Sequence, residues 1–187
     1  MFTAKTLRSQ NIAEYVLYMW QIEDIIRANG LDLEKIRAVI VEPSPLTEEQ
    51  KKKELQWYGE LIDMMCIEGK QEKGHLQINQ NILIELADLH AMLLHSPKFP
   101  DYSALFYQTL PIIVELRAKS GSGKVGEIET CFNALYGLLL MRLQNKQITE
   151  ATQKAINQIS KFISLLASYY HKDKIHPLFG KDDYGQL

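Results

Sequence analysis

The residues best suited to chemistry lie in an apolar segment near the start of the chain, NIAEYVLYMWQIEDIIR, residues 11–27. At about 100° per residue, Glu23 and Arg27 fall on one side of a helix, among apolar side chains. The narrow polar side, with Glu14 and Gln21, lies opposite. Glu23 and Arg27 have the spacing of an ion pair, and a buried charge is costly unless it is paired. Two interpretations stay open: a self-compensated pair in the core, or carboxylates that face a ligand pocket.

His90 is the third candidate for a ligand site. In the segment NILIELADLHAMLLHSP, residues 81–97, it falls within a broad apolar arc. A lone histidine there is typical of a hydrogen-bonded core residue, although perturbed titratable groups also gather at functional sites. In the functional interpretation, an interhelical pocket near Glu23, Arg27 and His90 binds a small ligand.

The histidines and carboxylates do not form a metal-site pattern. A di-metal helical bundle needs two Glu-x-x-His pairs and two further glutamates. The chain has one such spacing, Glu72 to His75, in a segment interrupted by glycine. His171 and His176 lack a carboxylate set for zinc, and no serine or cysteine has the context of a strained nucleophile elbow. We expect no metal, no cofactor and no catalytic residue, so enzymatic activity is the less favoured hypothesis.

The stretch SGSGKVGE, residues 120–127, shares glycines and a lysine with phosphate-binding loops. Such a loop needs a first glycine, then Gly-Lys and a hydroxyl residue, between a strand and a helix. Ala118 stands where the first glycine should be, and Val125 stands where the hydroxyl should be. The preceding segment is helical in pattern. The stretch therefore predicts a turn between helices, with Lys124 in solvent.

Composition excludes several classes of protein. The chain has 187 residues, is 46% hydrophobic and 24% charged, and carries a net charge of −2. Its basic run, Lys51 to Lys53, follows Glu48 and Glu49 at helix-pair spacing, which predicts a solvated helix face and no nucleic-acid surface. The longest apolar run, residues 134–141, is too short to span a bilayer, and no signal peptide is apparent. We expect a soluble cytoplasmic protein without nucleic-acid or membrane partners.

Helix-period signals dominate the chain, and alternating strand signals are nearly absent. Thr47, Asp101 and Thr149 are expected to cap helices, and Pro111 is expected to kink a helix or divide it. Cys66 and Cys131 lie in amphipathic patterns and are expected to be reduced core thiols, and Tyr107 is expected in the core with most other aromatic residues. The predicted helices cover about residues 9–29, 32–41 (where a strand is the alternative), 47 to the glycine-flanked break at 69–74, 76–95, 101–119, 125–145 and 149–172.

The expected fold is a single all-α domain over residues 1–187. It is a bundle of six to seven helices with mostly antiparallel neighbours, because the connections are short. The helical core covers about residues 9–173, and about residues 174–187 form an irregular tail. No linker is long enough to separate two domains.

The N-terminal segment also carries a resemblance to a known family. NIAEYVLYMWQIEDIIRANGLDLEKI, residues 11–36, resembles the opening of an uncharacterised family of all-helical Bacteroidetes proteins, a domain of unknown function of about this length. The stretches at residues 81–97 and 163–174 are similar to it as well. The resemblance covers nearly the whole chain and implies a bacterial cytoplasmic helical protein. It implies no activity, ligand or site residue.

Three hypotheses for function follow. The first is a non-enzymatic interaction or scaffold protein, a homo-oligomer that buries leftover apolar helix faces. Exposed aromatic residues or methionines on the helix beginning at residue 47 or on the helix at 101–119 would favour it. The second is a small-ligand-binding or sensing module with a pocket near Glu23, Arg27 and His90. The third, least favoured, is a metal-dependent enzyme.

Overall fold

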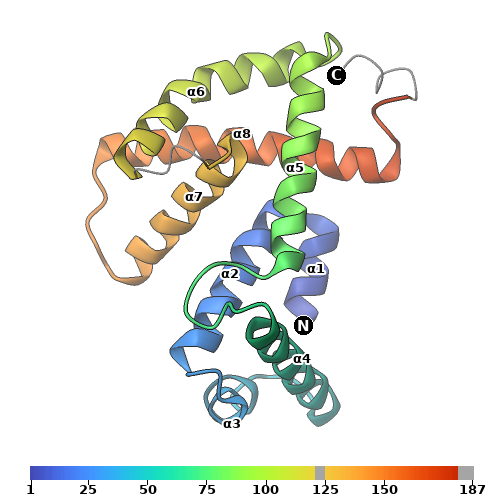
Figure 1. Ribbon diagram of the computed structural model, residues 1–187, viewed down its shortest axis with the longest axis vertical. Helices are drawn as coiled ribbons and strands as arrows, with labels where there is room; N and C mark the ends of the chain where they lie inside the picture. Colours follow the sequence, from blue (N-terminus) through green and yellow to red (C-terminus); the bar gives the residue numbers. More distant parts are fainter. Residues whose placement is uncertain (121–124, 181–187) are drawn as a thin grey trace. The chain divides into compact units, whose positions relative to one another are not determined.

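The structure is a computed structural model that describes residues 1–120 and 125–180 (Figure 1). The described residues form eight α-helices and one π-helix, without a strand, so the all-α prediction is confirmed. Contacts divide the chain into two compact units, which we call unit 1 (Met1–Ile82) and unit 2 (Leu83–Leu187). The single domain and the antiparallel order of its helices stay predictions. The stretch at 121–124, where a turn is predicted, lies outside the described residues.

Unit 1 begins with two helices where the sequence predicts one. Asn11 has extended backbone angles (φ −152°, ψ 98°) and its side chain accepts the N–H groups of Ala13 and Glu14, so it ends one helix and caps the next. Asp32 caps the next helix and residues 33–41 are helical, which excludes the strand alternative. The helices of unit 1 are α1 (Phe2–Gln10), α2 (Ile12–Ala28), α3 (Leu33–Ile36), the π-helix η1 (Arg37–Val41), α4 (Glu48–Ile67) and the first residues of α5 (Gln77–His95).

Local capping sets several boundaries where the sequence predicts them. Thr47 accepts the N–H of Gln50, whose side chain accepts the N–H of Thr47 in return, which is the predicted capping box. Gly30 follows α2 with φ +67°, a left-handed angle that glycine adopts without steric cost.

Cys66, near the end of α4, is exposed, so the prediction of a core thiol is wrong at this position.

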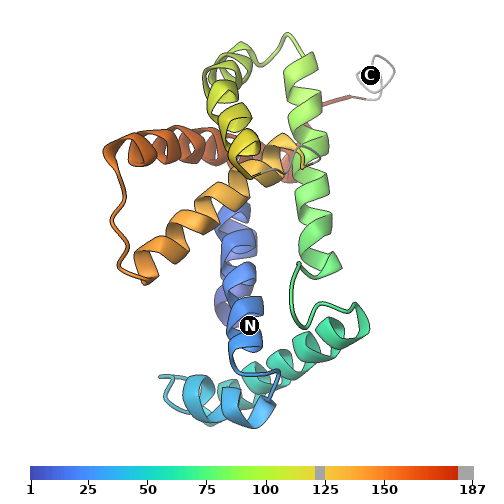
Figure 2. The ribbon, with the colours of Figure 1, turned by 60° about the vertical axis from the view of Figure 1, so that its left-hand side comes forward.

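Unit 2 contains the rest of α5 and three long helices that pack on one another, α6 and α7 both lying against α8 (Figure 2). Pro100 is the first residue of α6, so Asp101 lies in the first turn and is not the cap. The helix runs unbroken through Pro111, and the predicted division at this proline does not occur. Thr149 caps α8 as predicted. The three helices are α6 (Pro100–Ser120), α7 (Glu127–Leu143) and α8 (Glu150–Ile175).

Candidate functional site

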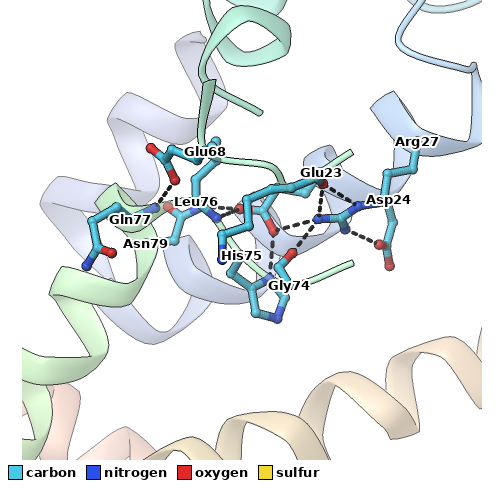
Figure 3. A network of polar contacts seen from close by, with 10 residues as sticks. Glu23, Asp24, Arg27, Glu68, Gly74, His75, Leu76, Gln77 and Asn79 are labelled. Carbon is cyan, nitrogen blue, oxygen red and sulfur yellow. Dashed lines mark hydrogen bonds and ion pairs between the residues drawn. The ribbon is translucent and has the colours of Figure 1, made fainter. Parts of the chain in front are cut away.

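The carboxylate of Glu23 lies inside unit 1 and is fully buried, with 0% of its surface exposed. Its Oε2 atom lies 2.6 Å from Nδ1 of His75. Its Oε1 atom accepts the backbone N–H of Leu76 at 3.0 Å and the side-chain amide of Asn79 at 2.7 Å (Figure 3). The two oxygens therefore hold three donors from the segment that enters α5.

Arg27 binds the same segment from the next turn of α2. Its Nη2 lies 4.0 Å from Oε2 of Glu23, so the predicted pair forms at the outer limit of an ion pair. Its shorter contacts are Nη1 to Asp24 at 2.8 Å and both Nε and Nη2 to the carbonyl of Lys70 at 3.2 Å. Nη2 also donates to the carbonyl of Gly74. The guanidinium thus binds backbone oxygens of the connection between α4 and α5.

Two carboxylates complete the N-terminus of α5. The first N–H groups of a helix have no partner within it, and negative charge there is favourable. The N–H of Leu76 donates to Glu23, and the N–H of Gln77 donates to Glu68 at 2.7 Å. We call Glu23, Arg27, Glu68, His75 and Asn79 the polar cluster. Its hydrogen bonds hold the connection between α4 and α5 against α2.

His75 is a member of the polar cluster that is partly accessible to solvent, since 21% of its side chain is exposed. Its ring stacks on Trp20, with centroids 4.0 Å apart and planes 11° apart. Nδ1 of His75 forms the hydrogen bond with Glu23. Nε2, on the other side of the ring, points away from the carboxylate (Figure 3) and forms no hydrogen bond with the described residues. A carboxylate that fixes one ring nitrogen leaves the other available to a ligand. Oδ1 of Asn79 is buried and likewise finds no donor among the described residues.

His90 belongs to unit 2, and its contacts are aromatic. Nδ1 lies 2.6 Å from the hydroxyl of Tyr102, and the rings of Phe106 and Phe162 pack edge-on at centroid distances of 4.7 and 5.6 Å. Burial lowers the pKa of His90 to about 4, so its imidazole is neutral at pH 7. Burial also raises the pKa of Tyr102. A pocket shared by His90 with Glu23 and Arg27 stays a prediction.

The sequence patterns did not predict three members of the polar cluster as site residues, namely Glu68, His75 and Asn79. In the sequence, the position of His75 three residues after Glu72 indicates only one half of a di-metal motif. The described residues contain no group of three or more His, Cys, Asp or Glu side chains that could hold a metal ion. The available signal was the pair of glycines at 69 and 74, which have φ of +65° and +83° and mark a sharply turned connection.

A second candidate surface lies on α6 in unit 2. Tyr107 is 64% exposed and Val114 is 56% exposed, so the prediction of a core position for Tyr107 is wrong. Spacings of three and four residues place side chains on one face of a helix. Five residues of α6 follow these spacings, and all five are apolar and exposed. We call them the α6 stripe: Ala104, Tyr107, Pro111, Val114 and Ala118.

Comparison with known proteins identifies one family. Residues 1–176 match a family model described as a domain of unknown function (DUF4924), and the chain belongs to this family. No curated protein and no solved structure matches the chain. Within the described ranges 1–120 and 125–180, no helix has the length and apolar character needed to cross a membrane.

Proposed function

We propose that this member of the family is a non-enzymatic interaction protein that binds a protein partner through the α6 stripe. The observation that carries the proposal is the joint exposure of Tyr107 and Val114 on one face of α6. Scattered apolar side chains are normal on a protein surface, whereas an aligned apolar series is characteristic of a contact surface. Tyrosine is also enriched at interfaces, because it combines a large apolar ring with a polar end.

The contacts of the polar cluster support a structural role for these residues over a catalytic one. The carboxylate of Glu23 accepts three hydrogen bonds, and Arg27 donates to Asp24 and to two carbonyls. Groups engaged in this way stabilise a fold and have little capacity left for a substrate. The cytoplasmic location and the Bacteroidetes origin belong to the same proposal.

The alternative is a small-ligand-binding or sensing module, and one observation favours it. Nε2 of His75, on a ring fixed by Glu23 and Trp20, is directed away from its carboxylate partner. A thermal-shift screen of small acids, amines and nucleotides with the wild type and with His75→Gln tests this alternative. Stabilisation of the wild type alone would support it, and no stabilisation by any compound would exclude the screened classes.

A photo-crosslinking amino acid at position 107 tests the interaction proposal in the native cell. We expect a discrete cross-linked product at this position. The matched control carries the same amino acid at Asn157, an exposed polar position on α8. Products that are absent at position 107, or the same at both positions, would contradict the proposal.

A further inference from the structure

We infer that the partner of the α6 stripe is α6 of a second copy of this chain, paired in the antiparallel direction. The inference rests on the proposed interaction function and names its partner. The spacing of the stripe is the spacing by which two helices pack along their length. At about 1.5 Å per residue, its five positions extend over about 21 Å, or roughly four helical turns.

Side-chain size along the stripe suits an antiparallel pair. We place the two-fold axis between Leu110 and Pro111. Tyr107 then lies level with Val114 of the second copy, so the large aromatic ring meets a smaller side chain. Ala104 lies within one residue of Ala118 of the second copy, and small residues at both ends let the helix backbones approach. A parallel pair would instead set the two Tyr107 rings against each other and the two Val114 side chains against each other.

Charge at the two ends of α6 favours the same direction. The exposed Asp101 lies in the first turn, and the exposed Lys119 lies in the last. Antiparallel pairing brings Asp101 level with residue 120 of the second copy, beside its Lys119, which already pairs with Glu115 of its own helix. Parallel pairing would bring like charges together and align the helix dipoles. Charge complementarity between copies therefore selects the antiparallel arrangement.

Equilibrium sedimentation of the full chain over a wide concentration range tests the choice of partner. We expect a monomer–dimer equilibrium. Tyr107→Glu should raise the dissociation constant at least about tenfold, as expected for a central aromatic anchor. Asn157→Glu adds the same charge to an exposed position on α8 and should leave the equilibrium unchanged. Equal effects of the two variants would overturn the inference, and circular dichroism of each variant verifies that it is folded.

Disulfide trapping tests the direction of pairing. On a Cys66→Ser background, chains with Tyr107→Cys and chains with Val114→Cys are oxidised separately and as a mixture. A disulfide usually joins residues whose Cα atoms are about 4.4–6.8 Å apart, and positions 107 and 114 are separated by about 10 Å along one helix. We expect the mixture to form the 107–114 disulfide and each variant alone to form little. Efficient cross-linking of each variant alone, without gain in the mixture, would overturn the antiparallel arrangement.

The experiments separate failure of this inference from failure of the proposed function. A wild type that stays monomeric at every concentration overturns the second copy as partner. If the photo-crosslinker at position 107 then captures a different protein in the cell, the interaction function still stands. If it captures nothing, both fail.

Discussion

Glutamine at position 23 keeps the shape of the glutamate side chain and removes its charge, so Glu23→Gln tests the polar cluster directly. The remaining oxygen can still accept the N–H of Leu76 and the amide of Asn79. The new amide nitrogen takes the place of the oxygen that lies 2.6 Å from His75 and 4.0 Å from Arg27. A donor then faces the guanidinium, and the hydrogen bonds lose their charge assistance.

The expected cost follows from these contacts. A hydrogen bond to a charged group contributes about 1.5–3 kcal/mol, and removing one partner of a buried ion pair costs about 3–5 kcal/mol. Arg27 keeps Asp24 and two carbonyls as partners, which lowers the cost of breaking its ion pair with Glu23. We expect Glu23→Gln to lower the free energy of unfolding by about 2–4 kcal/mol. Glu14→Gln is the matched control, because Glu14 is exposed on the same helix, and it should cost less than about 1 kcal/mol.

Urea denaturation followed by tryptophan fluorescence measures this difference, since Trp20 stacks on His75, a member of the cluster. Native-state hydrogen exchange adds a local readout. The amide of Leu76 should lose protection in Glu23→Gln, while amides in the middle of α8 keep theirs. If Glu23→Gln were no more destabilising than Glu14→Gln, and Leu76 kept its protection, the cluster would not hold α5 to α2.

Three further predictions concern other parts of the chain. The pKa of His90 is about 4 in the folded protein against an ordinary value of 6.5, so the unfolded chain takes up the proton first and stability falls as the pH drops from 6.5 to 4, by about 3 kcal/mol in total. Urea midpoints measured at several pH values should show this loss in the wild type but not in His90→Leu; identical profiles would contradict it. A chromogenic thiol reagent should label Cys66 rapidly and Cys131 only on unfolding, because Cys131 is buried and its pKa is raised to about 12; two fast thiols would refute this. Gly137→Ala should raise stability by about 1 kcal/mol, because Gly137 lies inside α7 and an added Cβ meets no atom within 4 Å, whereas Gly30→Ala should lower stability because φ is +67°. Thermal denaturation compares the two glycine variants, and a less stable Gly137→Ala would be the contrary result.

The helices were predictable where local signals suffice. Apolar side chains at helical spacing located the long helices, and the hydroxyls of Thr47 and Thr149 marked two beginnings that the structure confirms. The helix at residues 2–10 was missed because most of its residues are polar and Ala4 is its single buried residue. The break at Asn11 was missed because asparagine also occurs inside helices, and its capping hydrogen bonds become evident only in the structure.

The candidate sites divide in the same way. Glu23 and Arg27 are four residues apart, so their proximity follows from helix geometry alone. The partners of Glu23 were not predictable, because His75 and Asn79 lie 52 and 56 residues further along the chain and only tertiary packing brings them near. On α6, apolar residues occur around most of the helix, so the sequence does not indicate that the face with Tyr107 is the exposed one.

The separation between Glu23 and its partners also bears on how fast unit 1 folds and unfolds. The hydrogen bond from Leu76 to Glu23 closes a segment of 53 residues, whereas the helices on either side of it form from local contacts. Closing a long loop costs conformational entropy before the contacts that it brings together can compensate for that cost. We therefore expect this bond to form after the folding barrier. Removing it should then accelerate unfolding and leave the refolding rate nearly unchanged. The polar cluster would in that case set the lifetime of folded unit 1, and with it the resistance of the connection between α4 and α5 to proteolysis.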